Sequence, residues 1–367
     1  MHVIVLGAGL AGVTSAWYLR QAGHVVTVID RQPAAGLEAS YANGGQISVS
    51  HPEPWANPGA PGQVLRWLGR EDAPLLFRPR LDWQQWSWGL RFLQECLPGR
   101  TRRNTIAIAR LALYSRACLH ALRVETGLEY DRLEKGILHL FFTPREFAQA
   151  GQRAALLLGF GMRAEVLDAR GCLAAEPALA HCRDALCGGL YAPEDETGDA
   201  FAFTQKLAAL CIQAGVVFRH GLRIQSLDAG AGSIAAAVVA DPQGTSERIG
   251  GDAFLLALGS YSTLLARPLG LSLPIYPVKG YSVTLPLAEN SDAPQVSITD
   301  ESRRIVCSRL GNRLRIAGTA ELAGYDTSID PVRCGAILRR ARQLFPQVQS
   351  VGEAEYWAGL RPATPSN

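Results

Sequence analysis

The stretch HVIVLGAGLAGVTSAWYLRQAGHVVTVID, residues 2–30, has the pattern of a strand, a glycine turn, a helix and a second strand. Residues 2–6 form a β-branched apolar run that suits a buried parallel strand. Small and apolar residues recur at helical spacing through residues 11–23, which end at a glycine. Residues 25–30 supply the second strand. The glycine motif therefore lies in the context in which it indicates a dinucleotide site.

The glycines of this turn have separate tasks. In such a unit Gly7 makes the tight turn, Gly9 lets the backbone approach a pyrophosphate, and Gly12 lets the helix pack on the strand. The N-terminus of the helix faces the anion. Asp30 ends the second strand, where its carboxylate can accept hydrogen bonds from a ribose. The motif predicts an adenine dinucleotide, but it does not separate FAD from NAD because both contain ADP.

The segment after the second strand favours FAD. A nicotinamide domain would continue with another helix and strand, whereas residues 31–50 read RQPAAGLEASYANGGQISVS, a polar passage rich in glycine and small side chains. Long structureless loops inside compact domains are uncommon unless they are functional. We therefore expect this passage to wrap around a ligand; the alternative is an ordinary surface loop.

Length and composition limit the class of protein. The 367 residues exceed the roughly 100–200 residues of a typical domain, which predicts two domains. A net charge of +3, from 36 basic and 33 acidic residues, is too balanced to indicate a nucleic-acid surface. The eight cysteines form no Cys-x-x-Cys pair, and we predict no metal site. Small-molecule chemistry is the expected function.

Further segments resemble a known family. After the opening stretch come EASYANGGQIS, EDETGDAFAFTQKLA, ALGSYST, YPVKGYSVT and YWAGLRPATP, in this order along the chain. Together they resemble the FAD-dependent D-amino-acid dehydrogenases of the small-subunit type, within the D-amino-acid oxidase superfamily. The likeness runs through essentially the whole chain.

The resemblance implies an α/β fold of mixed type. A Rossmann-like FAD-binding domain is expected to be interleaved with a substrate domain that is built on a mostly antiparallel sheet with helices. The FAD-binding domain would comprise residues 1–55, 195–270 and 350–367, and the substrate domain residues 56–194 and 271–349.

The resemblance also implies where FAD binds. Residues 216–228 are expected as paired strands over the adenine, with the backbone of Ile224 meeting the base, and a buried strand within residues 252–262 is expected to run into a second glycine turn at Gly259. The implied cofactor-binding residues lie in the first turn, in the loop after it and at these later positions: Val5, Leu6, Gly7, Ala8, Gly9, Leu10, Ala11, Gly12, Asp30, Arg31, Ser40, Asn43, Gly44, Gly45, Gln46, Ile224, Ala257 and Gly259.

Transfer of a hydride from an amino acid to a flavin demands orientation more than an acid and a base. A bidentate arginine is best suited to fix the α-carboxylate. Arg361 matches the arginine that binds this carboxylate in the superfamily; the alternative is a surface arginine in an Arg-Pro turn. Tyr281, next to Lys279 and Gly280, matches a strand beside the substrate cavity, and the alternative is a half-buried strand aromatic. His51 is a lone histidine and is not assigned a catalytic role.

The function that the resemblance implies is the FAD-dependent oxidative deamination of D-amino acids such as D-alanine to 2-oxo acids and ammonia. A hydride would pass from the α-carbon to the flavin, and the electrons would go on to an acceptor other than oxygen, such as membrane quinone. A D-hydroxyproline dehydrogenase and a glycine or sarcosine oxidase are the alternatives, because the shape of the pocket sets the substrate.

Residues 81–93 bear on the location of the protein in the cell. They carry Trp83, Trp86, Leu90 and Leu93 near one face of a predicted helix, with basic residues on either side. Such a face suits a lipid interface, or else it packs against the substrate domain. No basic leader precedes the first strand, and no apolar stretch reaches about 18 residues. We expect a cytoplasmic protein, with peripheral contact to the inner face of the cell membrane.

In the family, the chain continues beyond the equivalent of RPATP with an Asp-Gly turn, a strand and a glycine-rich segment near the flavin. This sequence stops at TPSN. We expect residues 1–367 alone to bind FAD poorly and to have little activity. The alternative from a different class is therefore a catalytically inactive, truncated remnant.

Overall fold

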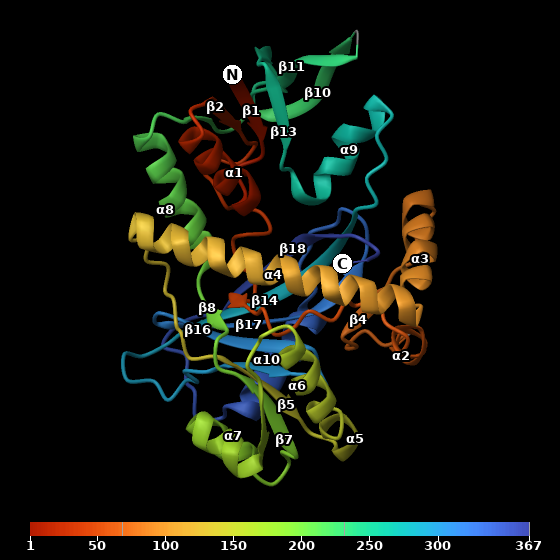
Figure 1. Ribbon diagram of the computed structural model, residues 1–367, viewed down its shortest axis with the longest axis vertical. Helices are drawn as coiled ribbons and strands as arrows, with labels where there is room; N and C mark the ends of the chain where they lie inside the picture. Colours follow the sequence, from red (N-terminus) through yellow and green to blue (C-terminus); the bar gives the residue numbers. More distant parts are fainter. Residues whose placement is uncertain (68, 231, 367) are drawn as a thin grey trace. The chain divides into compact units, whose positions relative to one another are not determined.

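The computed structural model describes residues 1–67, 69–230 and 232–366, and its chain forms two compact units (Figure 1). Each unit is assembled from three separate segments. Unit 1 comprises Met1–Tyr41, Ala200–Pro277 and Leu360–Ala363; unit 2 comprises Ala42–Asp199, Val278–Gly359 and Thr364–Asn367. Leu68, Ala231 and Asn367, which the expected domain ranges include, lie outside the described residues. The assignment of a cofactor domain and a substrate domain stays a prediction.

The first sheet of unit 1 is parallel, with the strand order β13-β1-β2-β9. Its strands are β1 (His2–Leu6), β2 (Val25–Ile29), β9 (Val217–Arg219) and β13 (Ala253–Leu256). Helix α1 (Leu10–Gln21) joins β1 to β2, and α8 (Ala200–Gln213) packs against α1. The predicted unit of strand, turn, helix and strand is confirmed. Since β1 lies between two parallel neighbours, every residue from Val3 to Leu6 is buried.

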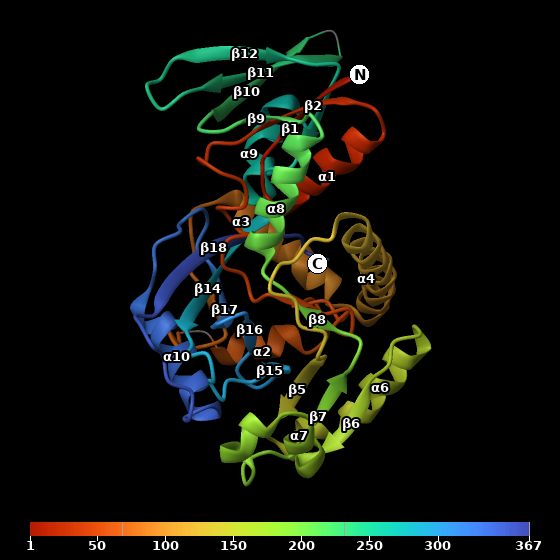
Figure 2. The same ribbon diagram turned by 90° about the vertical axis from the view of Figure 1, so that its left-hand side faces the viewer.

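Residues 216–228 contribute to two strands, as predicted, but the predicted pairing of these strands with each other is wrong. Strand β9 joins the parallel sheet, whereas β10 (Arg223–Gly230) starts a second sheet of unit 1 with β11 (Ser233–Ala240) and β12 (Ser246–Gly250), visible in Figure 2. The residues between β9 and β10 bond elsewhere: the amides of Gly221 and Leu222 donate to the carbonyls of Gln32 and Asp30. This bonding carries the chain away from β9, so no hairpin forms.

The expected buried strand within residues 252–262 is a half-buried edge strand. Only β1 pairs with β13 in the described part of the chain, and all four residues of β13 keep an intermediate exposure. Three short helical segments follow it in unit 1: η2 (Gly259–Tyr261), α9 (Ser262–Ala266) and η3 (Arg267–Leu269).

A nine-stranded sheet, most of whose residues belong to unit 2, has the order β18-β14-β17-β16-β15-β5-β7-β6, with β4 beside β17. Its pairs are mostly antiparallel, and the pairs β15–β5 and β17–β4 are parallel. The mixed fold class is thereby confirmed. The strands are β4 (Leu75–Phe77), β5 (Ile137–Phe141), β6 (Glu165–Asp168), β7 (Gly188–Ala192), β14 (Tyr276–Pro286), β15 (Ser297–Asp300), β16 (Ile305–Leu310), β17 (Arg313–Leu322) and β18 (Glu355–Ala363).

Helices surround this sheet, and α10 (Pro331–Leu344) packs its apolar residues into the main core. The others are α2 (Ala60–Trp67), α3 (Trp83–Glu95), α4 (Pro98–Thr126), α5 (Pro144–Phe147), α6 (Ala150–Gly159), α7 (Ala169–Ala175) and η1 (Pro177–Cys182). Among the described residues, none of the helices has the length and hydropathy needed to cross a bilayer. Residues 144–159 form two helices, α5 and α6, because the amide of Gln149 bonds three residues back to Glu146 and closes α5.

A buried network of charges lies at the β5–β15 side of the sheet. Oε1 of Glu301 accepts hydrogen bonds from Nδ1 of His139 at 2.9 Å and from Nη1 of Arg153 at 2.8 Å. Nη1 of Arg304 donates to Oε2 of Glu301 at 2.6 Å, and Nε2 of His51 lies 3.6 Å from Oε1. One carboxylate thus gathers two arginines and two histidines.

His51, His139 and Glu301 bring donor atoms within 4.8 Å of one another, close enough to ligate a metal ion. The guanidinium groups of Arg153 and Arg304 already pair with this carboxylate, and Arg153 also pairs with Glu53 at 3.1 Å. A divalent cation would add two charges beside them in a poorly solvated position, where repulsion between like charges is strong. We assign the cluster as an ion-pair network that fixes the segment around His51 to the sheet.

Burial, and to a smaller extent the nearby Arg153, lower the pKa of His139 to about 4. An unfolded chain binds the proton already below about pH 6.5, so this histidine contributes stability above that pH and loses it as the pH falls towards 4. The shift corresponds to up to about 3 kcal/mol. His139→Gln should therefore show a shallower loss of unfolding free energy between pH 7 and about 4 in urea titrations. His181→Gln, at an exposed histidine, is the control; parallel curves for wild type and His139→Gln would contradict the assignment.

Candidate functional site

The glycine turn after β1 leaves no room for side chains at two positions. Gly7 has a φ of +112°, and a Cβ there would lie 2.5 Å from the carbonyl oxygen of Ala257. A Cβ on Gly12 would lie 1.8 Å from the carbonyl oxygen of Gly7. Helix α1 therefore packs directly on the strand, as the motif predicts. Ala257 belongs to the same contact, since its amide donates to the carbonyl of Leu6 at 2.8 Å.

The start of α1 is open and fits an anion. Gly9 is the N-cap and has no side chain to satisfy the first amides, and the nearest atom to a Cβ on it would be Oγ of Ser40 at 3.8 Å. Oγ of Ser40 accepts a hydrogen bond from the amide of Leu10 at 3.1 Å. The amide of Leu10 is bonded to Ser40, and the next amides of the first turn, together with the helix dipole, suit a pyrophosphate. Of the other predicted residues of this turn, Val5, Leu6 and Ala8 are buried, and Ala11 is exposed.

Asp30 ties the second strand to the turn. Its Oδ2 accepts a hydrogen bond from the amide of Ala8 at 2.6 Å, and its Oδ1 accepts one from the amide of Gln32 at 2.8 Å. The bond to Ala8 was not foreseen, because residues far apart in a sequence give no sign that they meet. An ionised carboxylate has about four acceptor positions, so Asp30 retains capacity for a ribose hydroxyl.

The remaining predicted residues of unit 1 lie at different depths. Arg31 donates from Nε to Glu38 at 2.8 Å, and its guanidinium lies 4.1 Å from the ring centroid of Tyr261. Ile224 is half-buried and pairs with Val239 of β11. Gly259 is exposed, with a φ of +54°. The partners of Arg31 are residues that the sequence did not single out.

The predicted flavin residues Asn43, Gly44, Gly45 and Gln46 form a loop on the large sheet of unit 2, here called the 43–46 loop. A Cβ on Gly44 would lie 2.8 Å from Cγ2 of Val306 in β16, so only glycine allows this approach. Nε2 of Gln46 donates to Oγ of Ser297 at 2.9 Å and to Oγ1 of Thr299 at 3.0 Å. The middle and the end of the loop are thus fitted closely to the strands beneath it.

The segment Asp195–Asp199, which follows β7, holds the other side of this loop. Strand β3 (Gln46–Ile47) pairs with β8 (Glu196–Thr197), and the amide of Gly198 donates to the carbonyl of Gly45 at 2.8 Å. The segment is itself anchored: Glu196 is bound by Arg123, and Nη2 of Arg313 donates to Asp199 at 2.8 Å. The motif DETGD stood out in the sequence, but its acidic residues gave no sign of this role.

Arg361 lies within β18, not in a turn, and is exposed. Desolvation by the surrounding protein lowers its pKa, while its side chain remains in contact with solvent.

Tyr281 is 2 % exposed, and its hydroxyl donates to Oε2 of Glu321 at 2.5 Å. Burial raises the pKa of Tyr281, and Glu321 raises it further. Oε1 of Glu321 is bound by Nε of Arg78 at 2.6 Å, and Nζ of the buried Lys279 donates to Asp326 at 2.8 Å. These surroundings are those of a strand aromatic that is more deeply buried than the half-buried one of the alternative, and Glu321 engages the hydroxyl proton of Tyr281.

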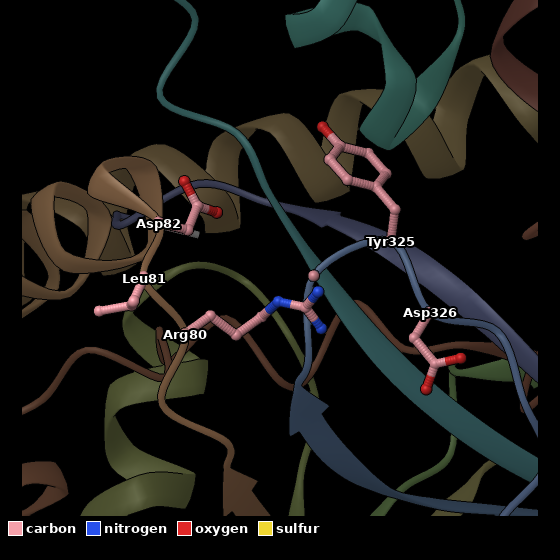
Figure 3. Close-up of a pocket in the computed structure, with 6 residues that line it drawn as sticks. Arg80, Leu81, Asp82, Tyr325 and Asp326 are labelled. Carbon is pink, nitrogen blue, oxygen red and sulfur yellow. The ribbon is translucent and has the colours of Figure 1, made fainter.

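Unit 2 also has a cavity of about 550 Å³ (Figure 3). No residue predicted for a site lines it. It presents one guanidinium and two carboxylates, and the carboxylate of Asp326 is already bound to Lys279. Its charges alone do not select a ligand. The lining residues are Arg80, Leu81, Asp82, Gly324, Tyr325 and Asp326.

The comparisons with known proteins cover the whole chain. The model of the family DAO, FAD dependent oxidoreductase, matches residues 2–367. The chain is 57 % identical to a D-amino acid dehydrogenase of Dechloromonas aromatica, over 100 % of this chain and 88 % of that protein. It is 53 % identical to a D-amino acid dehydrogenase of Paramagnetospirillum magneticum, over 100 % of this chain and 86 % of that protein.

A solved structure, glycine oxidase from Geobacillus kaustophilus, matches with a TM-score of 0.73 and 24 % identity over 99 % of this chain and 82 % of that one. At this identity the match shows the fold alone. The family model and the two relatives, taken with the glycine turn, establish membership: the chain belongs to the DAO family of FAD-dependent oxidoreductases.

Proposed function

We propose that this protein is a D-amino acid dehydrogenase that acts on D-alanine or a similar D-amino acid. The observation that carries the proposal is the identity of 57 % to a protein of that name over the whole of this chain. The substrate would lose a hydride from its α-carbon and a proton from its amine, and water would convert the imino acid to a 2-oxo acid and ammonia. When bound, FAD supplies the acceptor for the hydride. The electrons then pass to an acceptor other than oxygen, such as a quinone.

Separate groups of residues would bind the cofactor and the substrate. The uncapped start of α1 and the turn around Gly9 bind the pyrophosphate, and Asp30 accepts from the ribose. The 43–46 loop contacts the flavin portion. Arg361 binds the α-carboxylate through two parallel hydrogen bonds, which fixes the α-carbon for hydride transfer. Unit 1 is the FAD-binding domain in this proposal, and unit 2 supplies the substrate domain.

Initial rates on several substrates test the proposal. With an artificial electron acceptor we expect the highest kcat/KM on D-alanine and no turnover of L-alanine. A higher kcat/KM on cis-4-hydroxy-D-proline, glycine or sarcosine would contradict the assignment and favour the alternative dehydrogenase or oxidase. Absence of turnover on all of these, in a protein that carries no flavin, would favour the non-catalytic alternative.

Arg361→Ala should lower kcat/KM for D-alanine by roughly a hundredfold or more, mainly through KM, because a charged hydrogen-bond partner of the substrate is lost. Arg361→Lys keeps the charge but loses the bidentate geometry, so an intermediate effect is expected. Arg339→Ala, at an exposed arginine of α10, is the control. A KM for Arg361→Ala within about a factor of two of wild type would remove Arg361 from the substrate site.

We further propose that α3 contacts the membrane surface. The stripe predicted from the sequence faces solvent: Trp83 is 77 % exposed, Trp86 47 %, Leu90 59 % and Leu93 51 %. The opposite face of the helix is buried through Trp88. A helix that turns tryptophan and leucine outward suits the lipid interface.

The charge around α3 favours an anionic bilayer. Residues 62–103 contain eight arginines and four acidic residues, whereas the whole chain is nearly balanced at +3. Arginines beside an apolar stripe are attracted to anionic headgroups within about a Debye length. We propose anionic lipid as the partner of this face of α3.

The double variant Trp83→Ser, Trp86→Ser should lose most of its co-sedimentation with vesicles that contain about 30 % anionic lipid. Its kcat with a soluble acceptor should stay unchanged. The matched control is Leu111→Ser, Tyr114→Ser, which removes two equally exposed apolar side chains from α4. Equal vesicle binding by wild type and the α3 variant would contradict a membrane role for this helix.

A further inference from the structure

The buried carboxylate of Asp195 gathers the segment that directly follows the 43–46 loop. Its Oδ1 accepts hydrogen bonds from the amides of Val49 at 3.1 Å and Ser50 at 3.3 Å. Its Oδ2 accepts from the hydroxyls of Ser50 at 2.5 Å and Ser48 at 3.1 Å. Asp195 is 3 % exposed. One side chain therefore holds three consecutive residues.

These bonds extend the pairing of β3 with β8. Ile47 pairs with Glu196, and Asp195 and Ser48 are the next residues on either side. A pair of two-residue strands is marginal by itself. Val49 and Ser50 are buried, so without Asp195 their amides would lie in the interior with no acceptor among the bonds described. The carboxylate keeps the end of β3 in place.

The other contacts of the 43–46 loop are made by residues that precede Ser48 in the chain. Nη1 of Arg315 donates to the carbonyl of Asn43, and the amide of Gly198 donates to that of Gly45. Gln46 is the last loop residue and also the first residue of β3. A shift of residues 48–50 would therefore pull the backbone of Gln46 against the bonds of its side chain to Ser297 and Thr299, while Arg315 holds the start of the loop.

We propose that Asp195 is a positioning residue, which holds the 43–46 loop in the conformation that binds the flavin portion of FAD. The inference rests on the proposed role of this loop in cofactor binding. Asp195 touches only the segment after the loop in the contacts described, so it acts through Gln46 and not on the cofactor.

The chemistry of the contacts predicts which substitutions are tolerated. All four partners of Asp195 donate, but two of them are serine hydroxyls, which can also accept. In Asp195→Asn the amide oxygen can keep both backbone amides, and the NH₂ group can donate to Ser48 and Ser50. Burial raises the pKa of Asp195, which agrees with a site that tolerates a neutral group. Asp195→Ala removes every partner.

The test compares the affinities for FAD and for ADP. The holoenzyme and its variants are dialysed against FAD, alone and with ADP as a competitor. ADP binds at the glycine turn and makes no use of the 43–46 loop. We expect Asp195→Ala to raise the Kd for FAD by roughly tenfold or more, Asp195→Asn by about threefold at most, and the Ki for ADP to stay within about twofold for both. The visible circular dichroism of bound flavin should change in Asp195→Ala only.

Glu194→Gln is the control, because Glu194 lies next in the chain and forms an exposed ion pair with Arg116. Unchanged FAD affinity in Asp195→Ala would overturn the inference. Equal losses of FAD and ADP affinity would overturn it too, since they indicate general damage to the fold. A wild-type protein that binds ADP but not FAD would overturn the proposed function itself, which is a different result.

Discussion

The close approach of α1 to the first turn is the constraint on which the rest of unit 1 depends. A side chain at Gly12 would meet the carbonyl oxygen of Gly7 at 1.8 Å, so the helix can start at this place only with glycine there. Packed in this way, the helix directs its uncapped amides into open space at Gly9. Asp30 then bonds to the amide of Ala8 and fixes the second strand to the same turn. The glycine at position 12, the packing of α1 and the open anion site at its start all depend on this one steric condition.

Buried carboxylates have a similar organising role in unit 2. Asp195 holds the segment after the 43–46 loop, Glu301 gathers the charges around His51, and Glu321 binds Tyr281 and Arg78. Each carboxylate is satisfied by several donors, which offsets the cost of removing its charge from water. These groups fix the loops that lie on the sheet. The chemistry proposed for the protein therefore depends on residues that would not touch the substrate.

The sequence predicted what local patterns determine. The glycine turn, the parallel strands around it and α3 were foreseen, because spacing and glycine placement act over a few residues. The mixed fold class was foreseen through the family resemblance. The break between α5 and α6 and the separate sheets of β9 and β10 were not foreseen, since both are decided by hydrogen bonds to backbone partners. The partners of Asp195 lie about 145 residues away along the chain, and the sequence gives no signal for them. Tyr281 was placed beside a cavity, although Glu321 holds it in the core.

In the proposed function this chain holds FAD and passes electrons from a D-amino acid to it. The visible absorption spectrum of the purified protein under anaerobic conditions is the decisive measurement. We expect a flavin spectrum that D-alanine bleaches and L-alanine leaves unchanged. A flavin that neither enantiomer reduces, or one that L-alanine reduces equally well, would contradict it.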